Sequence, residues 1–140
     1  MHVVARLLIF GLASALANGG AMAGTATPIQ CSVRTGNKLL APMTSEAICQ
    51  RFIGAFARAS GITASAAASL PADGLVVALH FRPQGVASAE ITRMRSGKAS
   101  APVSFNLAVS DRRFAADDID RLAASAAQGL PTSSQRQPRR

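Results

Sequence analysis

The residue with the clearest potential for chemistry is His80, which lies in a stretch of alternating apolar and polar residues. An imidazole exchanges protons near neutral pH, so it could activate a serine hydroxyl as a nucleophile. Ser88 or Ser104 would be that serine, and Glu90 could orient the ring from a neighbouring strand. A small hydrolase, or a ligand-binding protein that uses this face, is therefore one interpretation. However, the sequence has no Gly-x-Ser-x-Gly elbow and an open sheet face excludes no water, which favours a solvated histidine without a catalytic role.

Three carboxylates, Asp117, Asp118 and Asp120, form the one acidic cluster of the sequence. Negative side chains are favoured in the first turn of a helix, where they interact with the positive end of the helix dipole. A calcium loop would need a longer regular series of oxygen ligands with a glycine at its sharp turn. The cluster therefore predicts the start of a helix, and we expect neither a metal site nor a cofactor.

The chain has two cysteines, Cys31 and Cys49, and in an exported protein such a pair predicts a disulfide. They are too far apart for a Cys-x-x-Cys redox motif. A zinc site is also disfavoured, because His80 is the single histidine beyond the first 23 residues. The expected role of the pair is to tether the first strand to the first helix.

Basic residues outnumber acidic ones by 15 to 7, which gives a net charge of +8 and favours anionic partners such as lipid head groups or acidic polymers. The candidate anion-binding residues fall at the two ends of a predicted strand meander: Arg82, Arg112 and Arg113 at one end, and Arg93, Arg95 and Lys98 at the other. A solvated rim in an arginine-rich composition is the competing interpretation. Because Tyr and Trp are absent, base stacking lacks support and nucleic acid is not an expected partner.

The first 23 residues have the pattern of a cleavable signal peptide, with Arg6 before an apolar run over 7–17 and small residues at Ala21 and Ala23. The run is shorter than the roughly 20 residues that span a bilayer. We therefore expect cleavage after Ala23, a periplasmic or secreted location, and no transmembrane segment in the remaining chain. Removing residues 1–23 takes away one basic residue and no acidic one, which leaves a charge of +7.

The rest of the chain is predicted to form a single domain over 24–130, followed by a disordered basic tail over 131–140. Period-two alternation predicts strands over 30–34, 75–82, 87–94 and 103–109. Helical periodicity and capping residues predict helices over 45–60 and 117–129, the second capped by Asp117. Two weaker expectations are a brief return strand over 39–41 and a helical extension over 64–69.

These elements predict a two-layer α+β fold in the order β-(β)-α-β-β-β-α. The expected sheet is mainly antiparallel, has about four strands, and carries both helices on one face. Its other face would be polar and open to water. The first or the last strand of the meander, 75–82 or 103–109, could be an edge that pairs with a strand of a partner. The favoured function is therefore a non-catalytic interaction or accessory module of the cell envelope, with a protein or an anionic envelope component as its partner; anion binding is a further alternative.

Overall fold

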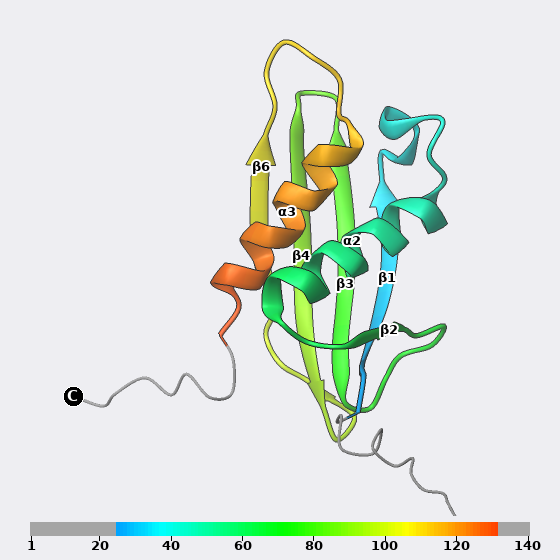
Figure 1. Cartoon of the computed structure of the whole chain (residues 1–140), viewed down its shortest axis with the longest axis vertical. Helices are drawn as coiled ribbons and strands as arrows, with labels where there is room; N and C mark the ends of the chain where they lie inside the picture. Colours follow the sequence, from blue (N-terminus) through cyan, green and yellow to red (C-terminus); the bar gives the residue numbers. More distant parts are fainter. Residues whose placement is uncertain (1–24, 132–140) are drawn as a thin grey trace, which may run out of the picture.

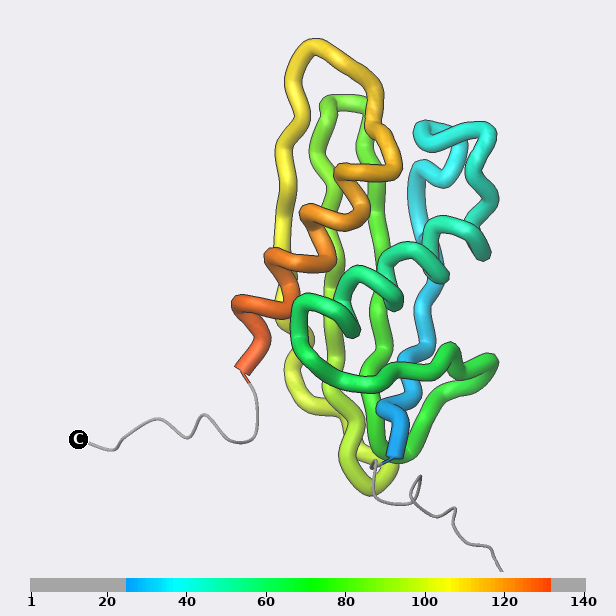
Figure 2. The backbone as a smooth tube through the Cα atoms, viewed as in Figure 1, coloured from blue at the N-terminus to red at the C-terminus, as the bar shows by residue number. Residues whose placement is uncertain are grey.

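A computed structural model describes residues 25–131 of the chain as a six-stranded sheet with helices on one face (Figure 1). The predicted signal peptide and the predicted tail beyond Pro131 lie outside the described residues. The tube in Figure 2 shows the two layers, with the two long helices side by side in front of the strands. No helix within 25–131 combines the length and the apolar character needed to cross a membrane. The predicted α+β class is confirmed.

The strands are β1 (Thr27–Thr35), β2 (Ala64–Ala66), β3 (Gly74–Arg82), β4 (Val86–Arg95), β5 (Lys98–Ala99) and β6 (Val103–Ala108). The helical elements are the 3-10 turn η2 (Asn37–Leu40) and the α-helices α2 (Ser45–Ser60) and α3 (Ala116–Gly129). Spatially the strands follow the order β2-β1-β3-β4-β5, and β6 pairs with β4.

The sheet is mixed and larger than the mainly antiparallel sheet of about four strands that the sequence predicts. Strands β3 to β6 form antiparallel pairs, whereas β1 runs parallel to both β2 and β3. The reason is the position of α2 between β1 and the strands that follow. A helix that crosses the sheet face returns the chain to the end where β1 began, so the next strands run in the same direction.

Two local predictions are wrong. Residues 39–41 do not form a return strand, because the chain turns at Gly36 in the left-handed conformation (φ 79°) and continues as η2. Residues 64–66 form strand β2 rather than a helical extension, because the edge of β1 offers backbone partners. The N–H of Thr27 donates to Thr63 O at 2.8 Å, and the N–H of Ala67 donates to Ile29 O at 2.9 Å. These bonds replace the helical pattern after Gly61 ends α2.

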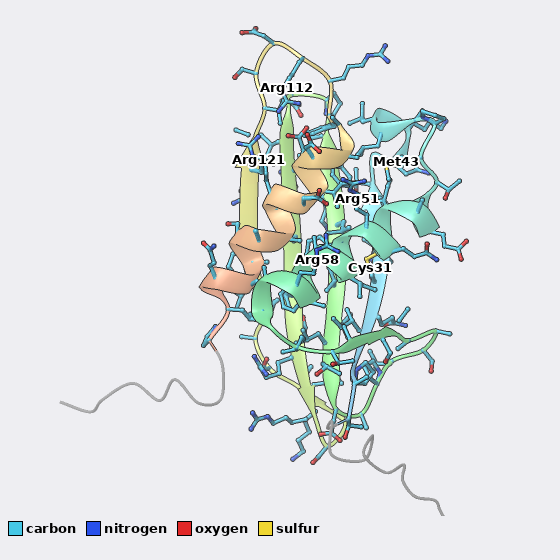
Figure 3. All side chains as sticks on the ribbon, in the orientation of Figure 1. Cys31, Met43, Arg51, Arg58, Arg112 and Arg121 are labelled. Atoms are coloured by element: carbon cyan, nitrogen blue, oxygen red, sulfur yellow. A yellow bond between two sulfur atoms is a disulfide. The ribbon has the colours of Figure 1, made fainter. Side chains whose placement is uncertain are left out.

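Helix α2 forms as predicted. Thr44 caps its start by accepting a hydrogen bond from the N–H of Ala47 at 3.1 Å, and Gly61 ends it in the left-handed conformation (φ 72°). The stripe of Ile48, Phe52 and Phe56 is buried against the sheet. The predicted disulfide between Cys31 and Cys49 is also confirmed, with Cα atoms 5.7 Å apart. It joins α2 covalently to β1, and Figure 3 places Cys31 where the helix passes that strand.

Helix α3 begins at Ala116, and its N-cap residue is Ala115, two positions before the predicted cap Asp117. The capping function passes to Asp118, whose carboxylate accepts the N–H of Ala115 at 2.8 Å. The apolar side chains of Ile119 and Leu122 on this helix are fully buried.

The core lies between the helices and one face of the sheet. Register places Leu79, Ala89 and Phe105 side by side, and likewise Phe81, Ala87 and Leu107. Phe81 and Phe105 therefore face the same side, as the alternation predicts. Pairing between β3 and β4 stays regular from Arg82↔Val86 to Gly74↔Met94.

Candidate functional site

His80 lies on the open face of the sheet, but the described residues do not assemble a catalytic relay around it. Its ring nitrogen Nδ1 is hydrogen-bonded to Thr35 Oγ1 at 3.1 Å. Ser88 is its direct cross-strand neighbour, whereas Glu90 lies opposite Ala78 and is only a diagonal neighbour. The hydrogen bonds of the described residues include none between His80 and Glu90. The geometry therefore gives the hydrolase interpretation no support.

At one end of the sheet, Arg112 is engaged in an internal ion pair rather than being available to a ligand. Its guanidinium binds both carboxylate oxygens of Asp118 at 2.8 Å, and Arg121 approaches the same carboxylate at 3.4 Å. Asp118 is 1% exposed. The hydrogen bonds from Arg112 lower the pKa of Asp118 below its ordinary value, against the opposing effect of burial. Of the candidates at this end, the side chains of Arg82 and Arg113 make no hydrogen bond within residues 25–131.

A second arginine clamp, which the sequence did not reveal, joins the two helices. Arg51 of α2 donates to both carboxylate oxygens of Asp120 on α3, at 2.9 Å and 2.8 Å, and Figure 3 shows Arg51 between the helices. These bonds lower the pKa of Asp120. Asp117 also lies 3.9 Å from Arg51. Asp118 and Asp120 are thus engaged in ion pairs within the domain. In the described part of the chain no group of His, Cys, Asp or Glu side chains is placed to hold a metal ion.

At the other end of the sheet, Arg93, Arg95 and Lys98 come together around the β4–β5 hairpin. Arg95 and Lys98 are direct cross-strand neighbours. Arg93 pairs with Leu75, so its side chain shares the face of the sheet that carries the helices. Its Nη2 donates to the carbonyl oxygen of Pro131, just beyond α3, at 2.8 Å. The structure thus brings one of the two predicted basic groups together at the β4–β5 hairpin.

The edges of the sheet differ from the prediction in part. Strand β3 lies between β1 and β4, so the prediction that the first meander strand is an edge is wrong. Strand β6 pairs with β4 alone among the described strands and is an edge, as predicted. Strand β1 provides the other partly free edge, because β2 covers it only from Thr27 to Ile29.

The free part of the β1 edge carries unpaired backbone groups. Thr27 and Ile29 direct their N–H and C=O groups toward β2, as their bonds to Thr63 and Ala67 show. In a strand these directions alternate with period two, so Cys31 and Val33 direct theirs to the same side, beyond the end of β2. Within residues 25–131 no strand pairs with them on that side. Sequence alternation reveals which face of a strand is buried, but it does not reveal where a neighbouring strand stops.

A groove runs beside this free edge, between β1 and α2. Its volume is about 430 Å³. The buried side chains of Ile29 and Ile53 and the Cys31–Cys49 disulfide line its depth, and the exposed side chains of Glu46 and Gln50 lie at its rim. The disulfide ties the two walls to each other.

Comparisons with known proteins add a distant structural likeness and no function. The sequence matches no protein-family model and no curated protein. A solved structure of a protein that is itself described only as uncharacterized matches with a TM-score of 0.41 and 15% sequence identity, over 73% of this chain and 86% of that chain.

Proposed function

We propose that this chain is an exported, non-catalytic interaction module that binds an extended segment of a partner protein along the free edge of β1. The observation that carries the proposal is the juxtaposition of unpaired strand edge and helix-walled groove. Cys31 and Val33 each offer one N–H and one C=O group on the open side. A partner strand placed there would continue the line of β2 along the sheet.

The geometry supports both affinity and selectivity for such a segment. Main-chain hydrogen bonds to a sheet edge are independent of the partner's side chains, so they supply affinity. In an extended segment alternate side chains point to one side, and here that side is the groove between β1 and α2. The apolar depth of the groove favours small or medium apolar side chains at those positions. Because the disulfide fixes α2 to β1, binding would order little of the domain.

Export is part of the proposal and has two supports. Residues 1–23 have the signal-peptide pattern, and the Cys31–Cys49 disulfide is compatible with an extracellular or periplasmic protein. Mass spectrometry of the protein recovered from a bacterial periplasm tests this point. We expect a chain that begins at Gly24 with its disulfide formed; a chain that keeps residues 1–23 contradicts export by a cleaved signal.

Binding is tested with peptides enriched on the purified protein from a random phage-displayed library. The informative variant is Val33→Pro, which removes one outward-facing N–H on an edge strand. Its matched control is Val33→Ala, which loses side-chain packing but keeps that N–H. We expect the enriched peptides to bind the unaltered chain, Val33→Ala and His80→Ala, and to lose binding to Val33→Pro. A thermal melt monitored by circular dichroism checks that each variant is folded.

Amide hydrogen exchange, monitored by NMR, gives a second readout that resolves individual residues. In the free protein the amides of Cys31 and Val33 should exchange fast, and that of Ser32, which faces β3, should exchange slowly. Bound peptide should slow Cys31 and Val33 and leave Ser32 unchanged. The proposal fails if no peptide is enriched, if Val33→Pro binds as well as Val33→Ala, or if His80→Ala abolishes binding.

A further inference from the structure

A hollow lies at the β4–β5 end of the domain, and neither the peptide groove nor the arginine ion pairs of the helices account for it. It is an open cleft of about 1050 Å³ between the last turns of α2 and α3, the connection 61–73 and the sheet. That volume lies slightly above the range of about 300–1,000 Å³ that is usual for small-ligand sites. The cleft meets the groove beside β1 at Ala67 but has different walls.

One wall of the cleft is apolar. Phe56, Leu75 and Leu130 line it with buried side chains, and Ile62 lines it while 37% exposed. Leu70, on the same connection and between two lining residues, is 60% exposed. Large apolar side chains that remain exposed beside a hollow mark a surface that can cover an apolar ligand.

Beside these apolar side chains, the lining of the cleft carries positive charge. Arg93 and Arg95 both line the cleft, and Lys98 is the cross-strand neighbour of Arg95. Within residues 25–131, one hydrogen bond of the Arg93 side chain is present, that to Pro131 O, although a guanidinium has five N–H donors. The acidic side chain in the lining is Asp73, whose carboxylate accepts the N–H of Ser96 at 3.0 Å. Three cations beside one carboxylate leave a surplus of positive charge at this rim.

We propose that this cleft binds a single-chain lipid with a phosphate head group. The alkyl chain would lie against Phe56, Leu75 and Leu130, and the phosphate would be bound by Arg93 and Arg95. A guanidinium fork matches phosphate oxygens with two parallel hydrogen bonds, which a hydrated lysine does not. Arg93 is well placed for this contact, because its strand position directs it toward the helix layer and the apolar wall rather than toward open water. The site is independent of the proposed peptide groove.

The test is calorimetric titration of the purified chain with dodecyl phosphate, kept below the concentration at which it forms micelles. Inorganic phosphate and the neutral amphiphile dodecyl maltoside are the comparison ligands. We expect dodecyl phosphate to bind more tightly than either, because only it contacts both the apolar side chains and the arginines. Arg93→Gln should weaken its binding by about tenfold or more, since a charge-assisted contact is lost. Ala59→Trp, which places a bulky side chain on the α2 wall, should weaken it as well.

The matched control is Arg34→Gln, which removes the same charge from an exposed arginine near the other end of β1. We expect dodecyl phosphate to bind this variant as it binds the unaltered chain. The proposal is overturned if dodecyl phosphate does not bind, if dodecyl maltoside binds equally well, or if Arg93→Gln and Arg34→Gln weaken binding to the same extent. Peptide binding to the β1 edge should be unaffected by Arg93→Gln, so the two proposals fail separately.

Discussion

Replacing Asp118 with asparagine removes the buried charge of the described core at almost constant shape. The carboxylate is 1% exposed and accepts hydrogen bonds from Arg112 and from the N–H of Ala115, all at 2.8 Å. Asparagine keeps one oxygen and turns an NH₂ group toward donors, so at least one charge-assisted bond is lost. Such bonds contribute about 1.5–3 kcal/mol each. We expect Asp118→Asn to lower the free energy of unfolding by about 2 kcal/mol at pH 7.

The pH dependence makes this prediction specific. Because the pKa of Asp118 is lowered in the folded protein, its contribution is fully present above the ordinary aspartate pKa of about 4 and is lost as pH falls through the lowered value. Urea unfolding at a series of pH values measures this. The difference between the unaltered chain and Asp118→Asn should shrink below about pH 4.

The control for this experiment is Asp117→Asn, which removes a neighbouring charge whose side chain is 88% exposed. A surface substitution of this kind is expected to change the free energy of unfolding by no more than about 0.5 kcal/mol. Equal stability of Asp118→Asn and Asp117→Asn at pH 7 would refute the reasoning, and so would a difference that stays constant down to the acid-unfolding range.

Two further predictions concern the covalent tether and a turn. Substituting both Cys31 and Cys49 by alanine should lower the free energy of unfolding by on the order of 3 kcal/mol, because the closed loop no longer restricts the unfolded chain; an unchanged urea midpoint would contradict this. Gly85→Ala should destabilise the protein by about 2 kcal/mol in the same assay, since Gly85 has φ 91° and a Cβ atom would collide with the carbonyl oxygen of Val109. A neutral result would show that the turn between β3 and β4 can rearrange freely.

The parts of the fold that alternation or capping determines locally could be predicted from the sequence. Strands β3, β4 and β6 follow from period-two patterns, and α2 follows from Thr44, Gly61 and the apolar stripe between them. The disulfide follows from the number of cysteines. The three-residue strand β2 could not be predicted, because it is specified by the free edge of β1 rather than by its own side chains.

The candidate sites depend on long-range geometry and were less predictable. Residue types show that Arg112 and Arg51 are cations, but not that folding places them on Asp118 and on Asp120, which is 69 residues from Arg51 in sequence. The same holds for Arg93, which the sequence places at one end of the strand meander but not beside a cleft. The free edge of β1 depends on where β2 stops, which is a property of the assembled sheet.

The position of the disulfide has a consequence for how the chain matures. Cys31 and Cys49 are 18 residues apart and precede β3 through β6, so both thiols emerge before the strands that complete the sheet. With two cysteines in the chain, there is one intramolecular pairing to make and none to correct. The disulfide can therefore form before the rest of the sheet. It would then hold β1 beside α2 until β3, the parallel neighbour of β1, has been synthesised and can pair with it.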